Sequence, residues 1–134
     1  MVPAWQGYRQ ARDHIERAIE LNPQYAPGYS QLAGLIMRME LDYPRAMSAL
    51  RQAERLGAPP NIIAGDKSRL LHLAGKLEDA LAVIEEAAVQ DPLFVPMRVE
   101  AVPILVKLGR YDEAVALVTE LDALTPQALS LIHI

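Results

Sequence analysis

Four alanines recur at a nearly constant spacing along this chain of 134 residues. Successive alanines lie 35, 34 and 34 residues apart, at Ala11, Ala46, Ala80 and Ala114. Each is followed four residues later by a large aliphatic residue, and usually by another alanine three residues beyond that. Residues at i, i+4 and i+7 share one stripe of an α-helix, so each set predicts an amphipathic helix. A period of about 34 residues between such helices is typical of a solenoid of stacked helix pairs.

Prolines and glycines mark the predicted helix ends. Pro23, Pro92 and Pro126 stand near the ends of three repeats, where proline stops a helix because it lacks the N–H that the next turn needs. Gly75 and Gly109 precede two of the repeated alanines and suit turns that need a positive φ. These signals predict seven short helices, over about 8–22, 26–39, 44–57, 62–74, 77–90, 94–108 and 111–124.

Three segments carry a resemblance to a known repeat family. They read Gly-Arg-Tyr-Asp-Glu-Ala at 109–114, Gly-Lys-Leu-Glu-Asp-Ala at 75–80 and Arg-Ala-Ile-Glu-Leu-Asn-Pro at 17–23. In this register the chain resembles the tetratricopeptide repeat (TPR) from about Tyr8 to Pro126. The resemblance implies an all-α fold, a right-handed superhelical solenoid of antiparallel helix pairs. We expect a partial repeat over 1–25 and further repeats over 26–60, 61–94 and 95–128.

The chain departs from the family pattern at three places. Pro103 falls inside the predicted helix 94–108, so we expect that helix to bend or to break into two pieces. The third repeat lacks the usual aromatic residue near its start, which predicts a first helix that begins late or packs loosely. The second repeat is one residue longer, and we expect the extra residue to enlarge the turn over 40–44.

Both ends of the chain look incomplete in this register. Residues 1–7 are too short for the first helix of a full repeat. Residues 129–134 read Leu-Ser-Leu-Ile-His-Ile, which resembles the translation of a common transposase sequencing adaptor. They are therefore either a non-native read-through tail or the ordinary apolar start of another helix. If the tail is not native, Val115, Val118 and Leu121 are expected to lack a covering helix.

Composition narrows the functional classes. The formal net charge is −4 and the basic residues are dispersed, which argues against a nucleic-acid surface. The chain has no cysteine, so it offers no disulfide, thiolate metal site or thiol nucleophile. No apolar run approaches the length of a membrane span, and no signal peptide is visible. These features favour a cytoplasmic protein, although a truncated start would leave export open.

No arrangement of residues indicates catalysis. His14, His72 and His133 are too scattered for a metal site, and neighbouring acidic residues such as Glu85-Glu86 and Asp112-Glu113 point to different sides of their helices. We therefore expect no enzyme activity, no cofactor and no metal.

The resemblance implies a concave groove lined by the first helix of each pair. In this chain the implied groove residues are Ser30, Gln31, Gly34, Met37, Arg38, Asp66, Arg69, His72, Val99, Glu100 and Lys107. Arg38, Arg69 and Lys107 could contact an acidic ligand, although Asp66 and Glu100 interrupt them. His72 is either a polar groove contact or a half-buried packing residue. The asparagines with which some family members clamp a peptide's terminal carboxylate are missing from these positions, so such a clamp is not expected.

Two functional hypotheses follow from the resemblance. In the first, the repeats bind a protein or peptide in the groove. In the second, they are a regulatory or sensory appendage of a larger bacterial protein, such as a cyclase, a kinase or a winged-helix regulator. The fold alone does not distinguish them, and the sequence does not set an oligomeric state.

Overall fold

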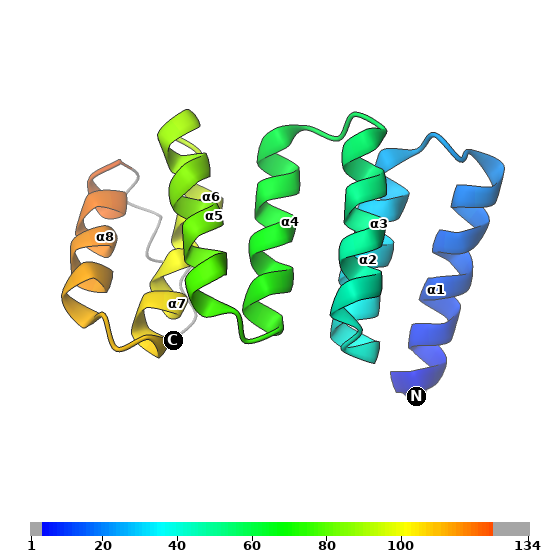
Figure 1. The fold of residues 1–134 in the computed structure, drawn as a ribbon, viewed down its shortest axis with the longest axis horizontal. Helices are drawn as coiled ribbons and strands as arrows, with labels where there is room; N and C mark the ends of the chain where they lie inside the picture. The colour runs from blue at the N-terminus through cyan, green and yellow to red at the C-terminus, as the bar shows by residue number, and fades with distance from the viewer. Residues whose placement is uncertain (1–3, 125–134) are drawn as a thin grey trace. The chain divides into compact units, whose positions relative to one another are not determined.

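All regular structure in the described part of the chain is helical. The computed structural model describes residues 4–124, so Pro126, His133 and the suspected tail 129–134 lie outside it. None of the described helices combines the length and apolar character needed to cross a bilayer. The helices are α1 (Ala4–Leu21), α2 (Ala26–Glu40), α3 (Tyr43–Arg55), α4 (Pro60–Leu73), α5 (Leu77–Gln90), α6 (Val95–Val99), α7 (Ala101–Lys107) and α8 (Tyr111–Leu124) (Figure 1).

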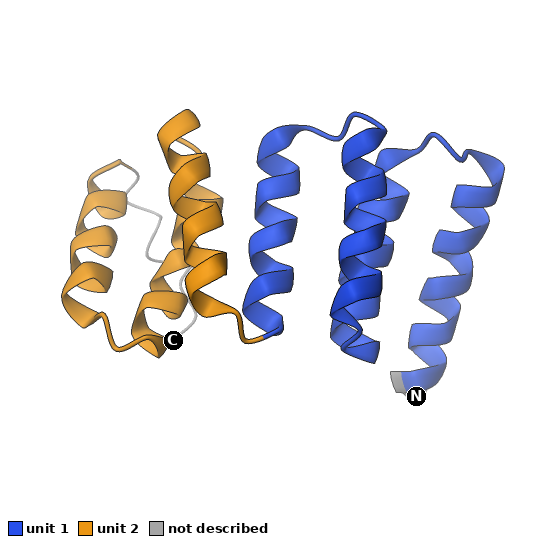
Figure 2. Ribbon diagram, in the orientation of Figure 1, with its two compact units in different colours: residues 1–74 blue, residues 75–134 orange. Residues whose placement is uncertain are grey.

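The chain divides into two compact units (Figure 2). Unit 1 comprises residues 1–74 and holds α1 to α4. Unit 2 comprises residues 75–134 and holds α5 to α8 in its described part. Within unit 1, helices that follow one another along the chain run in opposite directions, and in unit 2 the successive pieces α6 and α7 both run opposite to α5 and α8, as Figure 1 shows.

Unit 1 is organised around α2, which packs against α1, α3 and α4. The repeated alanine of α3, Ala46, and its partner Ala53 are both 0% exposed. Side chains this small let neighbouring helices approach closely, as the predicted stripe of α3 requires. The buried core contains Ala33, Ile36, Met37, Ala46, Met47, Leu50, Ala53, Ile63 and Leu70.

Unit 2 repeats the arrangement less regularly. Here α7 packs against α5 and α8, and α6 contacts all three of those helices. Ala80 and Ala114 are buried at the helix contacts, as predicted. Val115 is exposed, but Leu121 is fully buried in a small core with Val99. Val95 of α6 also packs against this core, so α6 covers Leu121. The expectation of missing cover concerned a chain without residues 129–134, which lie outside the described part, and it stays a prediction.

Pro103 accounts for the break between α6 and α7. The ring of a proline collides with the carbonyl four residues earlier, here that of Val99, and proline has no N–H to bond that carbonyl. The helix accordingly stops at Val99. The amide of Glu100 bonds the carbonyl of Met97, three residues back, at 3.1 Å, and not the carbonyl four residues back as in an α-helix. Of the two outcomes predicted for this helix, the structure shows two short pieces.

The turn between α2 and α3 differs from the prediction. It is Leu41-Asp42, two residues between helix ends, and Leu41 stands five residues before its repeated alanine just as Gly75 and Gly109 do. Leu41 has a φ of 54°, while the two glycines have 77° and 75°. The turn is therefore not enlarged. A leucine instead adopts the left-handed conformation that glycine adopts at much lower cost.

Two helices begin earlier than predicted. Helix α1 extends back to Ala4, so residues 4–7 lengthen this helix instead of forming part of a preceding one. Helix α4 begins at Pro60 rather than late. Proline suits the first turn because its fixed φ is already helical and its missing N–H would have no helical partner there.

A group of polar side chains joins α1 to α2. The Arg12 guanidinium donates hydrogen bonds to Glu40 Oε2 and to the Tyr8 hydroxyl, both at 2.8 Å, and to Glu16 Oε1 at 2.9 Å. Partial burial alone would raise the pKa of Glu40, but a hydrogen bond from Tyr8 and the charges of Arg12 and Arg45 together hold it below its ordinary value. Ionised Glu40 therefore stabilises unit 1.

The strained turn predicts a stabilising substitution. Leu41→Gly should raise the free energy of unfolding by about 1 kcal/mol, because glycine adopts a positive φ without the steric cost that leucine pays. Gly109→Leu should lower it by a similar amount. No atom lies within 4 Å of a Cβ built at Gly109, so that loss would come from backbone conformation alone. Urea denaturation measures both, and a destabilised Leu41→Gly variant would contradict this account of the turn.

The Glu40 contacts predict a pH-dependent difference in stability. Because the pKa of Glu40 is lowered in the folded state, its contribution is complete above its ordinary pKa of 4.5 and is lost as the pH falls through the folded value. Glu40→Gln should therefore lower the Tm at neutral pH, and the difference from wild type should shrink in acid. Glu54→Gln removes an exposed carboxylate that forms no ion pair within residues 4–124 and serves as the control. A difference that persists in acid would contradict the prediction.

Candidate functional site

The predicted groove residues of unit 1 lie together around a surface hollow. This hollow, the unit 1 hollow, has a volume of about 370 Å³ and is bounded by α2 and α4. Leu70 and Leu73 of α4 and Ala33 of α2 supply its apolar lining. The predicted residues that line it are Ser30, Gln31, Gly34, Arg38, Asp66 and Arg69.

Arg38 contributes an uncompensated positive charge to the unit 1 hollow. Its Nε donates to the Gly34 carbonyl one turn earlier, at 3.2 Å. A Cβ at Gly34 would lie 3.3 Å from Arg38 Nη2, so the glycine lets the guanidinium fold back along α2. Among residues 4–124, no carboxylate forms an ion pair with Arg38.

Arg69 is placed differently, although it is one of the same predicted trio of cations. Its Nη2 lies 2.7 Å from Asp66 Oδ1 on the preceding turn of α4. This pair neutralises most of the positive charge of Arg69, so Asp66 interrupts the row of cations as predicted. Arg38 is therefore the main positive centre of the unit 1 hollow.

Two predicted groove residues were assigned to the wrong face. Met37 is 2% exposed and packs in the core of unit 1, and Val99 is 6% exposed in the core that contains Leu121. Neither side chain is available to a partner. One residue of helix turns the side chain by about 100°, so a residue next to a surface position can be buried.

The other predicted residues lie outside the unit 1 hollow. His72 is half-buried on α4 and does not line it. Glu100 stands at the break between α6 and α7, and Lys107 is the last residue of α7. Glu100 and Lys107 both belong to unit 2.

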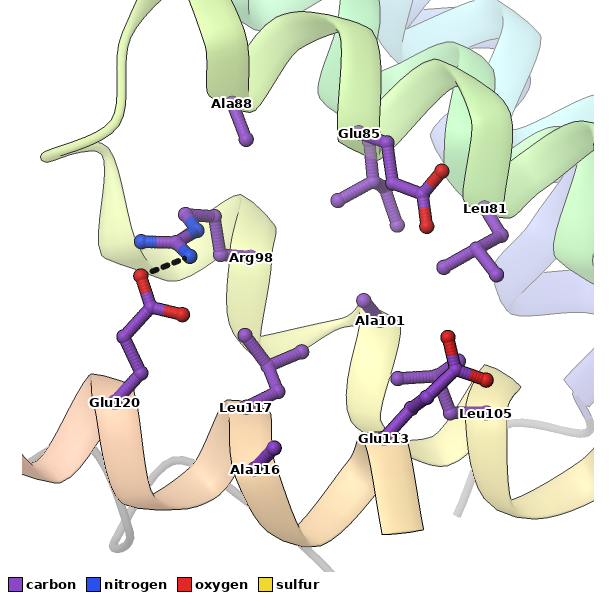
Figure 3. Close-up of a pocket in the computed structure, with 11 residues that line it drawn as sticks. Leu81, Glu85, Ala88, Arg98, Ala101, Leu105, Glu113, Ala116, Leu117 and Glu120 are labelled. Atoms are coloured by element: carbon purple, nitrogen blue, oxygen red, sulfur yellow. Dashed lines mark hydrogen bonds and ion pairs between the residues drawn. The ribbon is translucent and has the colours of Figure 1, made fainter. Parts of the chain in front are cut away.

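Unit 2 contains a second hollow that the sequence analysis missed. This unit 2 hollow, of about 270 Å³, is bounded by α5, α6, α7 and α8 (Figure 3). Alanines at Ala88, Ala101 and Ala116 leave space that larger side chains would fill. Its remaining lining residues are Leu81, Ile84, Glu85, Arg98, Leu105, Glu113, Leu117 and Glu120.

The charges of the unit 2 hollow are unequally paired. Arg98 Nη2 donates to Glu120 Oε1 at 2.7 Å, and its Nη1 donates to the Pro92 carbonyl at 3.0 Å. Glu113 accepts hydrogen bonds from Arg110, which lower the pKa of Glu113 and keep it ionised. Glu85 forms no ion pair within the described residues.

One sequence signal could have pointed to this hollow. Glu113 and Glu120 are seven residues apart, which places them on one stripe of α8 with Ala116 between them. Carboxylates around a small residue leave a recess with charged edges. The sequence analysis considered only adjacent acidic residues such as Asp112-Glu113, and it did not compare positions seven residues apart.

Within residues 4–124, no three His, Asp or Glu side chains come together as a candidate metal site.

The fold is shared with solved TPR proteins. No protein-family model matches the sequence, and no curated protein matches it either. TTC0263, a thermophilic TPR protein of Thermus thermophilus, is similar at 21% identity with a TM-score of 0.78, covering 92% of this chain and 69% of that one. YrrB, a TPR protein with an unusual peptide-binding site, is similar at 18% identity with a TM-score of 0.62. That match covers 93% of this chain but 64% of YrrB, less than two thirds of its length. The chain thus has the all-α fold of TPR proteins.

Two neighbouring residues of α2 test the assignment of core and surface. Met37→Ala should lower the free energy of unfolding by about 2–5 kcal/mol, because it leaves a cavity in the core. Arg38→Ala should change it by less than about 0.5 kcal/mol, because Arg38 is exposed. Urea denaturation monitored by circular dichroism measures both values. Similar losses for the two variants would mean that the unit 1 hollow is misplaced on α2.

Proposed function

We propose that this chain is a protein-interaction module whose unit 1 hollow binds a peptide or protein segment. The observation that carries the proposal is the gathering of polar and charged side chains from α2 and α4 around one hollow of about 370 Å³. YrrB, which has the same fold, has a peptide-binding site, and this supports peptide binding as a use of the fold.

The chemistry of the unit 1 hollow suits a segment with an acidic side chain or a carbonyl oxygen. The Arg38 guanidinium is a hydrogen-bond donor and forms no ion pair among the described residues. A carboxylate can accept two hydrogen bonds from one guanidinium at once. Ser30 and Gln31 line the same side, on α2, and supply further polar groups. The apolar side chains of Leu70 and Leu73 lie opposite, on α4. A bound segment would therefore place a polar group near Arg38 and an apolar group against Leu73.

Selection from a phage library of random dodecapeptides on the full chain tests the proposal. Peptides selected by the wild type should bind about tenfold more weakly to Arg38→Glu/Arg69→Glu, because both cations line the unit 1 hollow. Arg9→Glu/Arg51→Glu makes the same charge change at exposed arginines outside the hollow and should bind like wild type. Circular dichroism of each variant verifies its helicity.

Two results would contradict the proposal. One is a selection that yields no binding peptide. The other is a set of peptides that bind Arg38→Glu/Arg69→Glu as tightly as they bind the wild type.

A further inference from the structure

The two units carry opposite formal charges. Unit 1 has nine basic and seven acidic residues, a net charge of +2, whereas unit 2 has four basic and ten acidic residues, a net charge of −6. The overall value of −4 therefore conceals a strongly acidic second half. Such a field attracts cationic partners and repels anionic ones.

The unit 2 hollow combines carboxylates with aliphatic side chains. Glu85 descends from α5 and Glu113 rises from α8, and their carboxylates point toward each other across the hollow (Figure 3). Leu81, Leu105 and Leu117 line the space between and beside them. Carboxylates above aliphatic side chains match the structure of a lysine or arginine side chain, whose stem is aliphatic and whose tip is cationic.

The pairing within the hollow leaves one carboxylate for a ligand. Arg98 is 12% exposed at its side chain and already bonds Glu120 and the Pro92 carbonyl. Arg110, which does not line the hollow, donates a hydrogen bond to Glu113. Glu85 has neither an ion pair nor a hydrogen bond from its side chain within residues 4–124. A cation entering between α5 and α8 would therefore pair first with Glu85.

We infer that the unit 2 hollow binds the side chain of a lysine or arginine from a basic protein segment. The inference deepens the proposed function, since it assumes that the chain binds protein segments and adds a second contact point of opposite charge. The size of the hollow supports a single side chain as its occupant. At about 270 Å³ it lies below the roughly 300–1,000 Å³ of pockets that enclose whole small molecules. The rest of the ligand must then lie outside it, as a peptide chain would.

Two phage libraries of dodecapeptides test the charge requirement. Both exclude lysine and arginine at the other positions, and the central residue is arginine in one and glutamine in the other. Only the arginine library should yield peptides whose affinity depends on Glu85. Those peptides should bind Glu85→Gln about fivefold more weakly, the upper range for an exposed ion pair, and should be displaced by salt.

Glu86→Gln is the matched control for charge. It removes the same charge from the next residue of α5, which is exposed and does not line the hollow. Peptides from the arginine library should bind it like wild type. Equal weakening by Glu86→Gln and Glu85→Gln would show a general attraction to unit 2 and would overturn the inference.

A second pair of variants tests the shape requirement. Ala116→Leu adds bulk at the edge of the hollow from an exposed position of α8, so it should leave the fold intact and weaken the same peptides about tenfold by excluding the side chain. Ala123→Leu makes the same change at an exposed position of α8 outside the hollow and should have no effect. Unchanged binding to Ala116→Leu would overturn the inference even if Glu85 proved important.

The outcomes separate this inference from the proposed function. Peptides that depend on Arg38 and Arg69, with none that depends on Glu85, would support the unit 1 hollow and overturn the unit 2 assignment. Peptides that depend on Glu85 and Ala116 but not on the two arginines would support the unit 2 assignment and contradict binding in the unit 1 hollow. Arginine and glutamine libraries that yield Glu85-dependent peptides equally often would also overturn the inference.

Discussion

Close contact between helices through alanine is the constraint on which both units depend. Ala46, Ala53 and Ala80 are each 0% exposed, and at each position a larger side chain would push the neighbouring helix away. Helices of this length are marginal in isolation, so their stability must come from such contacts. The hollows are the complement of the same arrangement. They form where a small residue leaves space at the surface, as the exposed Ala116 does in unit 2.

Much of the fold could be predicted because periodicity and proline act locally. The apolar stripe that contains Ala80 and Ile84 predicts a helix from local sequence alone. Pro103 likewise predicts, without any other residue, that the helix 94–108 is interrupted. Leu41 could not be predicted in the same way. Its positive φ is imposed by a two-residue turn between α2 and α3, and nothing in a leucine favours that conformation. The turn could be recognised only by aligning it with the corresponding glycines.

The candidate site was harder to predict, because the direction in which each side chain points depends on how its helix is rotated about its axis. Arg38 was correctly assigned to the surface, yet its neighbour Met37 belongs to the core. The unit 2 hollow involves residues from four helices, and its charge depends on which carboxylate Arg98 and Arg110 bind. The Arg110–Glu113 pair is local, but Arg98 and Glu120 are 22 residues apart in sequence, so no local pattern reveals that Glu85 forms no ion pair within residues 4–124. Dividing the acidic residues between the two units was within reach of the sequence once the boundary was known.

The break at Pro103 links the folding of unit 2 to the occupancy of its hollow. Helices α6 and α7 have 5 and 7 residues, too few to persist without the helices around them. Arg98 comes from the first piece and Ala101 from the second. A molecule that binds both pieces in their folded arrangement adds its binding free energy to the stability of that arrangement. Local opening of α6 and α7 would thus be suppressed by a partner in the hollow, and the same opening would set a limit on the partner's residence time.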